Sequence, residues 1–273
     1  SLGADLVAAI ITQGEPDRAL SIQWIENTDQ LEQTIRTSAI QTIVLGTRLL
    51  NDAPDITNAL YKTLFAQVTI LDRAELEEAT TGRIPLSHVN QSWFLQHLNE
   101  SDKTAYESFK RVTDILLAVP FAIFTLLCTP IVAAIIFASS RGPIFYSQTR
   151  VGRHGKTMRI WKFRTMYLNA EKDGPQFTVS TKTDPRLFPL GRVLRQLRID
   201  ELPQIWNVLR GDLSFIGPRP ERPEFVAPLI ERMPYYNLRH LTKPGLTGWA
   251  QVRFLTPTSS LEDNLKKLQY DLY

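Results

Sequence analysis

The longest uninterrupted apolar run of the chain covers residues 115–138 and contains no charged side chain. A buried core helix is one interpretation, but 24 residues without a charge are far more typical of a membrane segment. A straight helix of this length reaches about 36 Å, which is enough to cross the hydrocarbon core of a bilayer. The pattern therefore predicts that the chain inserts into a membrane.

The topology of this segment depends on its prolines and on its flanks. Pro130 removes a backbone hydrogen bond inside the helix and bends it near Thr129. Lys and Arg residues occur on both sides, whereas a spanning helix concentrates them on the cytoplasmic side. We therefore expect residues 109–140 to form a re-entrant membrane helix, broken at Thr129-Pro130. Proline kinks also occur in spanning helices, so crossing the bilayer stays an alternative.

Residues 1–90 show short apolar runs that alternate with helical patterns. The runs cover residues 6–12, 42–46 and 67–71, and helical character is found at 29–37 and 55–65. This alternation predicts an α/β fold with a Rossmann-like parallel sheet. A dinucleotide site needs a glycine-rich turn after the first strand, and the sequence has none there. We expect a regulatory or scaffold domain, incomplete at its opening strand, that could provide homodimer contacts.

A polar connector at residues 91–108 follows, and the charge changes sign across it. Residues 1–100 carry 6 Lys and Arg against 13 Asp and Glu, a net charge of −7. Residues 101–273 carry 25 against 15, a net charge of +10. The second part is therefore expected to meet an anion: a phosphorylated substrate, acidic lipid or nucleic acid. The lone Cys128 excludes an internal disulfide and a cysteine-built metal site.

Two strands are predicted after the membrane segment, at residues 144–147 and 158–166. Side chains alternate along the second strand, so Lys162 and Arg164 share one face. They could form an ordinary solvated edge, or they could bind phosphate oxygens beside the membrane. The residues alone leave both interpretations open.

Residues 190–211 carry the strongest local pattern of the chain. Apolar side chains recur at helical spacing and predict a helix with a core-facing stripe: Leu190, Val193, Leu194 and Leu197. A basic strip lies beside this stripe, formed by Arg192, Arg195 and Arg198. We expect Asp200 to cap the N-terminus of a second helix, with Glu201 in its first turn and Gly211 at its end.

Asp200 and Glu201 form a candidate chemical centre. An aspartate N-cap is common, so the pair alone does not establish catalysis. The pair does lie beside three arginines, at a helix start that can also bind phosphate, and soon after a membrane segment. Further along, prolines make residues 217–223 rigid and can direct Arg219 at a phosphate. An ordinary proline-rich turn is the alternative.

From residue 109 onward the sequence resembles the bacterial sugar transferases, which are monotopic phosphoglycosyl transferases. The resemblance rests on seven blocks in the expected order: Phe109-Lys110-Arg111 with Asp114, Gln148-Thr149-Arg150-Val151-Gly152, Lys162-Phe163-Arg164-Thr165-Met166, Asp200-Glu201-Leu202-Pro203-Gln204, Asn207-Val208-Leu209-Arg210-Gly211-Asp212, Gly217-Pro218-Arg219-Pro220, and Pro244-Gly245-Leu246-Thr247-Gly248-Trp249-Ala250-Gln251. Each block alone is only suggestive. Their ordered succession is specific.

The resemblance implies a two-step transfer, the first membrane step of polysaccharide or glycoconjugate assembly. Asp200 would attack the β-phosphate of a UDP-sugar and release UMP, and a polyprenyl (undecaprenyl) phosphate would then accept the sugar phosphate. Glu201 would help to hold Mg²⁺. Four cations would bind the substrate phosphates: Lys162, Arg164, Arg195 and Arg219. The sugar itself is not specified by these residues.

The resemblance also implies a location and an extent. It places an α+β catalytic domain, residues 141–273, on the cytoplasmic face of the bacterial inner membrane, docked on the lipid bilayer. The family breaks its helix at a Ser-Pro pair, for which this chain has Thr129-Pro130, and Thr can bond back to the helix as Ser does. Large members carry a Rossmann-like domain preceded by spanning helices. Amphipathic helices follow the region corresponding to this C-terminus, so we expect the catalytic domain to lack its C-terminal part.

Three other functions compete with this one. The main alternative is an inactive membrane-anchored interaction or scaffold module of the same fold, which the absent glycine-rich turn supports. An ordinary glycosyltransferase would pass the sugar alone and release UDP. Nucleic-acid binding would account for the basic half of the chain, but the long membrane segment argues against a nucleic-acid partner.

Overall fold

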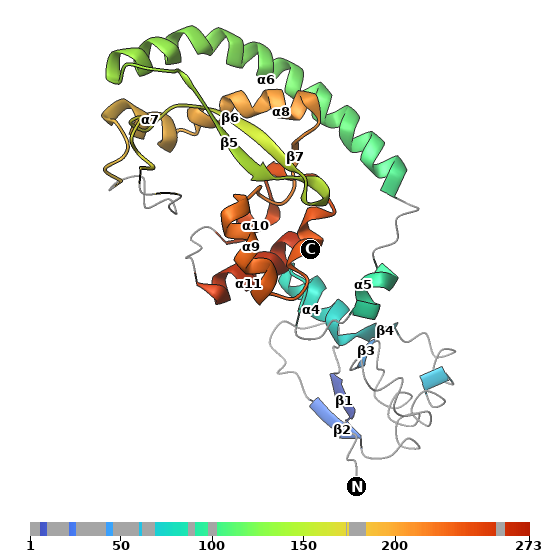
Figure 1. The fold of residues 1–273 in the computed structure, drawn as a ribbon. Coiled ribbons are helices and arrows are strands. Elements are labelled where there is room, and N and C mark those ends of the chain that lie inside the picture. Colours follow the sequence, from blue (N-terminus) through green and yellow to red (C-terminus); the bar gives the residue numbers. More distant parts are fainter. Residues whose placement is uncertain are drawn as a thin grey trace. The chain divides into compact units, whose positions relative to one another are not determined.

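The computed structural model describes residues 6–9, 22–25, 42–45, 60–61, 69–86, 91–97, 103–172, 174, 184–254 and 260–273. The chain divides into two compact units, residues 1–97 and residues 98–272, and this division falls inside the predicted connector. Figure 1 shows the elements, and each unit is described by itself.

The first unit contains two pairs of short strands. β1 (Leu6–Ala9) and β2 (Ile22–Ile25) are antiparallel, whereas β3 (Thr42–Leu45) and β4 (Thr69–Asp72) are parallel. The β3–β4 pair agrees with the expected sheet, and the antiparallel β2 is a strand that the sequence pattern did not predict. The predicted helices at 29–37 and 55–65 lie outside the described residues, except for 60–61. The Rossmann-like fold therefore stays a prediction.

Among the described residues of this unit, α4 (Arg73–Thr81) and α5 (Gln91–His97) follow the strands. α4 begins at a capping box, in which Asp72 accepts from the Ala74 N–H at 2.8 Å and Glu75 accepts from the Asp72 N–H at 3.2 Å. It ends at Gly82, which adopts the left-handed conformation. α5 lies within the predicted connector, so part of that segment is helical.

The second unit is built on α6 (Lys103–Ser139), a single helix of 37 residues that curves along its length (Figure 1). It passes through Pro120 and Pro130 without ending, so the break expected at Thr129-Pro130 is not observed. The Thr125 and Thr129 hydroxyls donate to carbonyls four residues earlier, at 2.8 and 2.7 Å. These bonds satisfy both hydroxyl groups within the helix itself, close to the prolines. α6 is long and apolar enough to cross a membrane.

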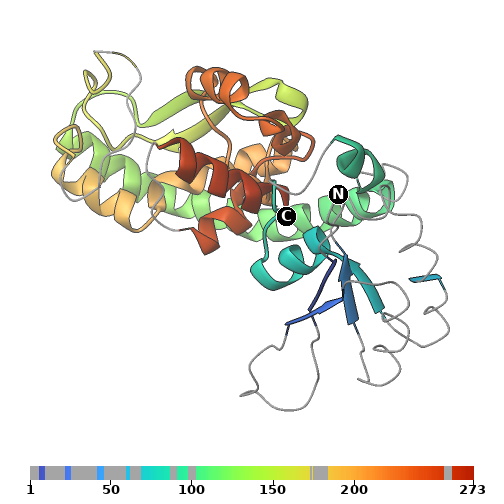
Figure 2. The same cartoon turned by 90° about the horizontal axis from the view of Figure 1, so that it is seen from below.

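One side of α6 packs against a layer of strands and helices (Figures 1 and 2). β5 (Phe145–Val151) and β6 (Thr157–Phe163) overlap the two predicted strands, and they form an antiparallel hairpin around the turn η2 (Arg153–Gly155). α7 (Pro189–Gln196) and α8 (Ile205–Arg210) lie beside the hairpin and along α6. Two clusters of buried side chains join these elements: Ala118, Ala122, Ile160, Ile205, Val208 and Leu213, and Val132, Ile136, Phe163, Phe188 and Leu194.

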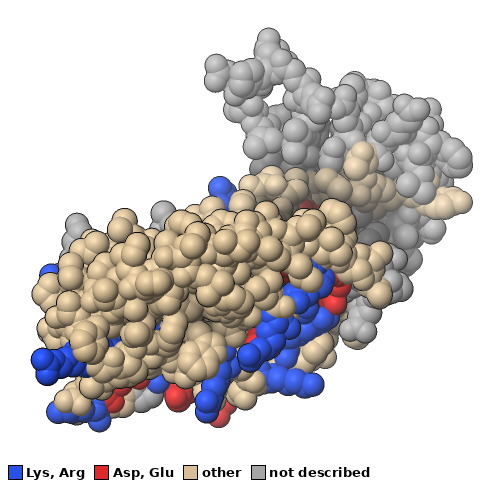
Figure 3. All heavy atoms as spheres, turned by 90° about the horizontal axis from the view of Figure 1, so that it is seen from above, with Lys and Arg blue, Asp and Glu red and all other residues tan. Residues whose placement is uncertain are grey.

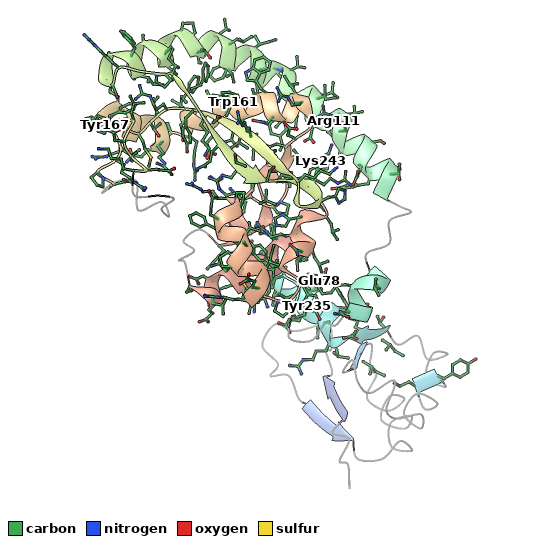
Figure 4. All side chains as sticks on the ribbon, viewed as in Figure 1. Glu78, Arg111, Trp161, Tyr167, Tyr235 and Lys243 are labelled. Atoms are coloured by element: carbon green, nitrogen blue, oxygen red, sulfur yellow. The ribbon has the colours of Figure 1, made fainter. Side chains whose placement is uncertain are left out.

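The N-terminal half of α6 is hydrogen-bonded to this layer. Arg111 donates to the carbonyls of Val208 and Leu209, at 2.5 and 2.6 Å, where α8 ends (Figure 4). The buried carboxylate of Asp114 accepts from Ser214 Oγ at 3.0 Å. Arg111 thus supplies donors to carbonyls that have no partner within α8.

The C-terminal end of α6 is fastened in the same way. Arg164, which follows β6, donates to the Pro143 carbonyl at 2.6 Å and to Ser140 Oγ at 2.9 Å. Its third contact is a hydrogen bond to the Ser140 carbonyl. Both ends of the apolar helix are therefore tied to one and the same layer.

The remaining elements surround the end of this layer. They are η3 (Ile199–Gln204), β7 (Ser214–Ile216), α9 (Pro223–Arg232), η4 (Tyr236–His240), β8 (Gly245–Thr247), α10 (Trp249–Arg253) and α11 (Leu261–Leu272). β7 and β8 pair in parallel.

The predicted core stripe of α7 is wrong for three of its four residues. Leu194 is 4% exposed and packs in the core, whereas Leu190, Val193 and Leu197 are 47%, 46% and 64% exposed. Helical periodicity correctly indicated an amphipathic helix, but its apolar face turns largely away from the protein interior. On the adjoining α8, Trp206 is 43% exposed.

Candidate active site

Asp200 and Glu201 lie in η3, directly after α7. The predicted N-cap role of Asp200 is wrong, because Arg198 precedes η3 in the left-handed conformation (φ 59°) and Asp200 is already inside the turn. A residue other than glycine in the left-handed conformation turns the chain sharply. This conformation is unfavourable because the side chain crowds the backbone. The reversal brings Asp200 into the interior, where it is 5% exposed. Gly211 ends α8 in the left-handed conformation, as predicted.

Glu201 is the centre of an ion-pair cluster. Its Oε1 atom lies 2.8 Å from Lys162 Nζ, 3.0 Å from an Arg219 nitrogen and 3.5 Å from an Arg198 nitrogen. These cations come from β6, from the loop after β7 and from the residue before η3. The structure therefore brings together Asp200, Glu201, Lys162 and Arg219, four of the six predicted site residues.

The two neighbouring carboxyl groups differ in acidity. Burial raises the pKa of Asp200 to about 6, with Glu201 adding to the rise and Lys162 opposing it. Burial also acts to raise the pKa of Glu201, but Lys162 and Arg219 outweigh it and hold that pKa at about 2. Glu201 is therefore firmly ionised at neutral pH. Asp200 is mostly ionised at neutral pH, but its burial makes the ionised form energetically unfavourable.

Asp200 has an atom without a partner. Its Oδ1 is buried and makes no hydrogen bond to any of the described residues. A buried carboxylate oxygen without a donor is unusual and costly, because it has lost water and gained nothing in exchange. Such groups gather at functional sites, and this oxygen is poised to react or to bind.

Asp200 borders a cavity of about 410 Å³. Among the described side chains that line it, seven are Lys or Arg and only three are Asp or Glu. The cations are Arg150, Lys162, Arg164, Arg186, Arg195, Arg219 and Arg222. A concave site with this excess of positive charge favours a ligand with several negative charges.

The other two predicted cations lie at the same cavity in different ways. Arg195, on α7, lines it, and its charge contributes to lowering the pKa of Asp200. Arg164 also lines it, but its guanidinium donates to Ser140 and Pro143 at the end of α6. A phosphate-binding role for Arg164 stays a prediction.

Arg219 is placed by two loops that touch through their backbones. The Gly217 N–H donates to the Thr247 carbonyl at 2.9 Å, and the Gly245 N–H donates to the Pro218 carbonyl at 3.0 Å. A Cβ atom on Gly217 or Gly245 would overlap the backbone of the facing loop. These two glycine-containing blocks, far apart in sequence, are thus one structural unit that supports Arg219.

The comparison with protein families decides the identity. The model of the bacterial sugar transferase family matches residues 105–273. The chain belongs to this family. Similar proteins include the UDP-N-acetylgalactosamine-undecaprenyl-phosphate N-acetylgalactosaminephosphotransferase of Aeromonas hydrophila, 37% identical over 217 residues, covering 78% of this chain and 49% of that protein.

Two further relatives carry glucose in their names. The UDP-glucose:undecaprenyl-phosphate glucose-1-phosphate transferase of Escherichia coli (strain K12) is 31% identical, over 93% of this chain and 54% of its own length. The protein of the same name from Caulobacter vibrioides (strain ATCC 19089 / CIP 103742 / CB 15) is 42% identical, over 56% of this chain and 57% of its own length. The chain spans about half the length of these relatives.

Several residues of this bacterial sugar transferase site were not singled out from the sequence. Arg150, Arg186 and Arg222 line the cavity, as do Tyr146 and Glu171. Arg150 lies in one of the recognised blocks, and its alternation with Gln148 on one strand was a usable signal. Arg222 lies in the proline-rich segment 217–223, where only Arg219 was singled out, and Arg186 comes from a segment without a pattern, so the tertiary fold reveals both at the cavity.

A metal ion was predicted at Glu201. Within the part of the chain that the structure describes, no group of three or more His, Cys, Asp or Glu side chains could hold a metal ion. The hydrogen bonds to Glu201 all end on Oε1. The residues thus fit a metal held by a carboxylate together with oxygens of a bound diphosphate, which is the usual arrangement for Mg²⁺.

Proposed function

We propose that this chain transfers a sugar-1-phosphate from a UDP-sugar to undecaprenyl phosphate through a covalent intermediate on Asp200. The observation that carries the proposal is the buried, unpartnered Oδ1 of Asp200 at the edge of a strongly cationic cavity. The relatives' names support a nucleotide-sugar donor and an undecaprenyl-phosphate acceptor. Because those names differ in the sugar, the proposal covers the class of UDP-sugars.

The chemistry divides into two displacements at one phosphorus atom. In the first, a carboxylate oxygen of Asp200 bonds to the β-phosphorus, the bond to the bridging oxygen breaks, and its electron pair leaves with UMP. In the second, a phosphate oxygen of the lipid attacks that phosphorus and the Asp200 carboxylate leaves. Burial suits this role, since a poorly solvated carboxylate of raised pKa is the more reactive nucleophile.

The cations around the cavity stabilise the charge that moves. Lys162 and Arg219 are held on one carboxylate oxygen of Glu201, so their donors are fixed beside Asp200 before substrate arrives. Arg195 and Arg150 line the same cavity and add positive charge for the diphosphate. Glu201 therefore orients the phosphate-binding groups, in addition to any contact with a metal ion.

Mg²⁺ remains part of the proposal. Glu201 would hold the ion with substrate phosphate oxygens, and the ion would neutralise charge on the diphosphate. Arg219 and Lys162 supply part of that neutralisation from the protein itself.

The membrane arrangement follows from how α6 is fastened. Figure 3 shows a broad surface without charged side chains, with Lys and Arg gathered along its margin. Leu116, Leu127 and Ile131 of α6 are each at least 66% exposed. Arg111 and Arg164 tie the two ends of the helix to one polar layer. A helix that crossed the bilayer would draw this layer into hydrocarbon, so we propose that α6 enters and remains in one leaflet.

Labelling from each side of sealed vesicles tests this topology. Single cysteines replace the exposed Ser108 and Arg141, one beyond each end of the apolar run, in a Cys128→Ser background. We expect a membrane-impermeant maleimide to label both positions from the same side, the cytoplasmic side in bacteria. Labelling of the two positions from opposite sides would show a spanning helix.

Product analysis tests the activity. Protein in detergent micelles with undecaprenyl phosphate and a panel of UDP-sugars should release UMP and form a lipid-linked sugar diphosphate. The Asp200→Asn variant should release none above background. Release of UDP would instead indicate an ordinary glycosyltransferase, and no nucleotide release with any sugar would favour the scaffold alternative. The proposed regulatory role and homodimer contacts of residues 1–90 are tested separately, by deletion and light scattering.

A further inference from the structure

Arg239, in η4, is a fully enclosed cation that lies outside the cavity. It is 3% exposed, and its guanidinium donates to Asp271 Oδ2 at 2.6 and 3.1 Å and to the Tyr236 hydroxyl at 3.0 Å. The side chain of Asp271, near the end of α11, is 2% exposed. Despite burial, which favours neutral forms, the negative charge of Asp271 keeps the pKa of Arg239 above its usual value.

One guanidinium nitrogen of Arg239 has a second acceptor. The Nη2 atom that contacts Asp271 also donates to the backbone carbonyl of Arg219, at 3.0 Å. The next peptide carbonyl, that of Pro220, accepts from Arg150 at 3.2 Å. The Pro218 carbonyl accepts from the Gly245 N–H. Three successive carbonyls around Arg219 are therefore each held by a different part of the fold.

A second contact joins α11 to the same loop. Lys267, one helical turn before Asp271, forms an ion pair with Glu221, whose backbone carbonyl accepts from the Val151 N–H at 2.9 Å. α11 thus reaches residues 219–221 through two acid–base pairs, of which Arg239–Asp271 is buried and Lys267–Glu221 is partly exposed. An isolated buried ion pair contributes little net stability. Stability alone therefore does not account for the Arg239–Asp271 pair.

We propose that Asp271 and Arg239 are positioning residues, which set the direction in which Arg219 presents its guanidinium to the substrate diphosphate. Asp271 fixes the planar fork of Arg239, and the fork fixes the Arg219 peptide. The Arg219 side chain then forms its ion pair with Glu201, at 3.0 Å. The inference deepens the proposed function and rests on it, since it assigns to Arg219 a ligand with two phosphates.

The test is a double-mutant cycle between Asp271 and Arg219, read by UMP binding and by the KM for the UDP-sugar. We expect Asp271→Asn to weaken UMP binding and raise KM about tenfold, with a smaller change in kcat. In an Arg219→Ala background the same change should have almost no further effect. In the Asp271→Asn variant the pH dependence that Asp200 imposes should stay where it is, because Asp271 lies outside the cavity that Asp200 borders.

A purely structural role for Asp271 predicts a different result. Leu268→Ala, on the same helix and 1% exposed, provides the matched control because it weakens α11 packing and removes no hydrogen-bond partner of Arg239. At an equal loss of thermal stability, the control should leave KM unchanged. The proposal is overturned if Asp271→Asn acts equally in the presence and absence of Arg219, or if Leu268→Ala reproduces its effect on KM.

Arg239→Lys adds a second check. Lys keeps the charge opposite Asp271 but lacks the fork that joins it to the Arg219 carbonyl, so we expect stability to be largely kept and KM to rise. An unchanged KM in this variant contradicts the proposal.

Measuring UMP binding and turnover separately also distinguishes the positioning role of Asp271 from the proposed transferase reaction. UMP binding that depends on Arg219 and Asp271 without turnover would count against the transferase reaction alone.

Discussion

Lys162 Nζ lies 2.8 Å from Glu201 Oε1, and this contact sets the electrostatics of the residue next to Glu201. The side chain of Lys162 is 18% exposed, and its partial burial lowers its pKa, while the charge of Glu201 opposes that change. The pair gives Glu201 a pKa of about 2 and leaves Asp200 at about 6. Two adjacent carboxyl groups are thus driven apart in acidity, a pattern that separates their roles at catalytic sites.

Loss of the Glu201 charge should destabilise the protein. Its folded-state pKa lies below the ordinary 4.5, so its contribution is fully present above pH 4.5 and is lost as the pH falls through about 2. We expect Glu201→Gln to lower the free energy of unfolding at pH 7 by an amount on the order of 2 kcal/mol, because Lys162 and Arg219 lose their shared partner. Thermal unfolding at pH 7 measures this. An unchanged Tm would contradict the ion-pair assignment.

Asp200→Asn should have the opposite effect on stability while it abolishes turnover. The folded-state pKa of Asp200 is raised from 3.8 to about 6, so the ionised form is disfavoured in the folded protein at higher pH. Above pH 6 the variant should gain stability on the order of 2 kcal/mol, and below pH 3.8 the gain should vanish. Unfolding curves at pH 7.5 and in acid test the sign. A loss of stability at pH 7.5 would contradict the buried-charge assignment.

The pH dependence of kcat/KM should report Asp200. We expect the rate to rise with pH around a midpoint near 6, as the carboxyl group loses its proton. Glu201→Gln should move this midpoint down, since it removes a negative charge that raises the pKa of Asp200. Lys162→Met should move it up, since it removes the opposing positive charge. If neither variant shifts the pH midpoint of kcat/KM, the midpoint reports a titrating group other than Asp200.

The exposed stripe of α7 should contribute to membrane binding. Leu190, Val193 and Leu197 are exposed on α7, and α7 lies along α6 (Figure 2). We expect Val193→Glu with Leu197→Glu to reduce binding to vesicles several-fold, with little change in Tm, because both positions are about half exposed or more. Gln196→Glu, at an exposed polar position of the same helix, is the control for added charge and should bind nearly as well as wild type.

The sequence predicted those features that depend on neighbours along the chain. The uncharged run predicted α6, the residues after it predicted two strands that overlap β5 and β6, and Gly211 marked the end of α8. The periodicity of α7 indicated an apolar face, but the same period serves a protein core and a lipid surface alike, so the side that Val193 faces was not predictable.

The site itself depends on contacts between distant segments. Arg219 and Lys162 were recognised as candidates, yet their shared partner Glu201 follows from the packing of β6 and the loop after β7 against η3. The left-handed Arg198, which turns Asp200 inward, carries no local signal, because glycine and asparagine are the residues usually found in that conformation. The course of the chain beyond α7 therefore required the structure.

Arg111 and Arg164 join both ends of α6 by hydrogen bonds to the layer that carries Asp200. Under the proposed function, the depth of α6 in the lipid would therefore also set the height of Asp200 above the lipid phosphates. A thinner or more loosely packed leaflet would change that height without altering a protein contact. The transfer rate would then depend on the bilayer as well as on the protein.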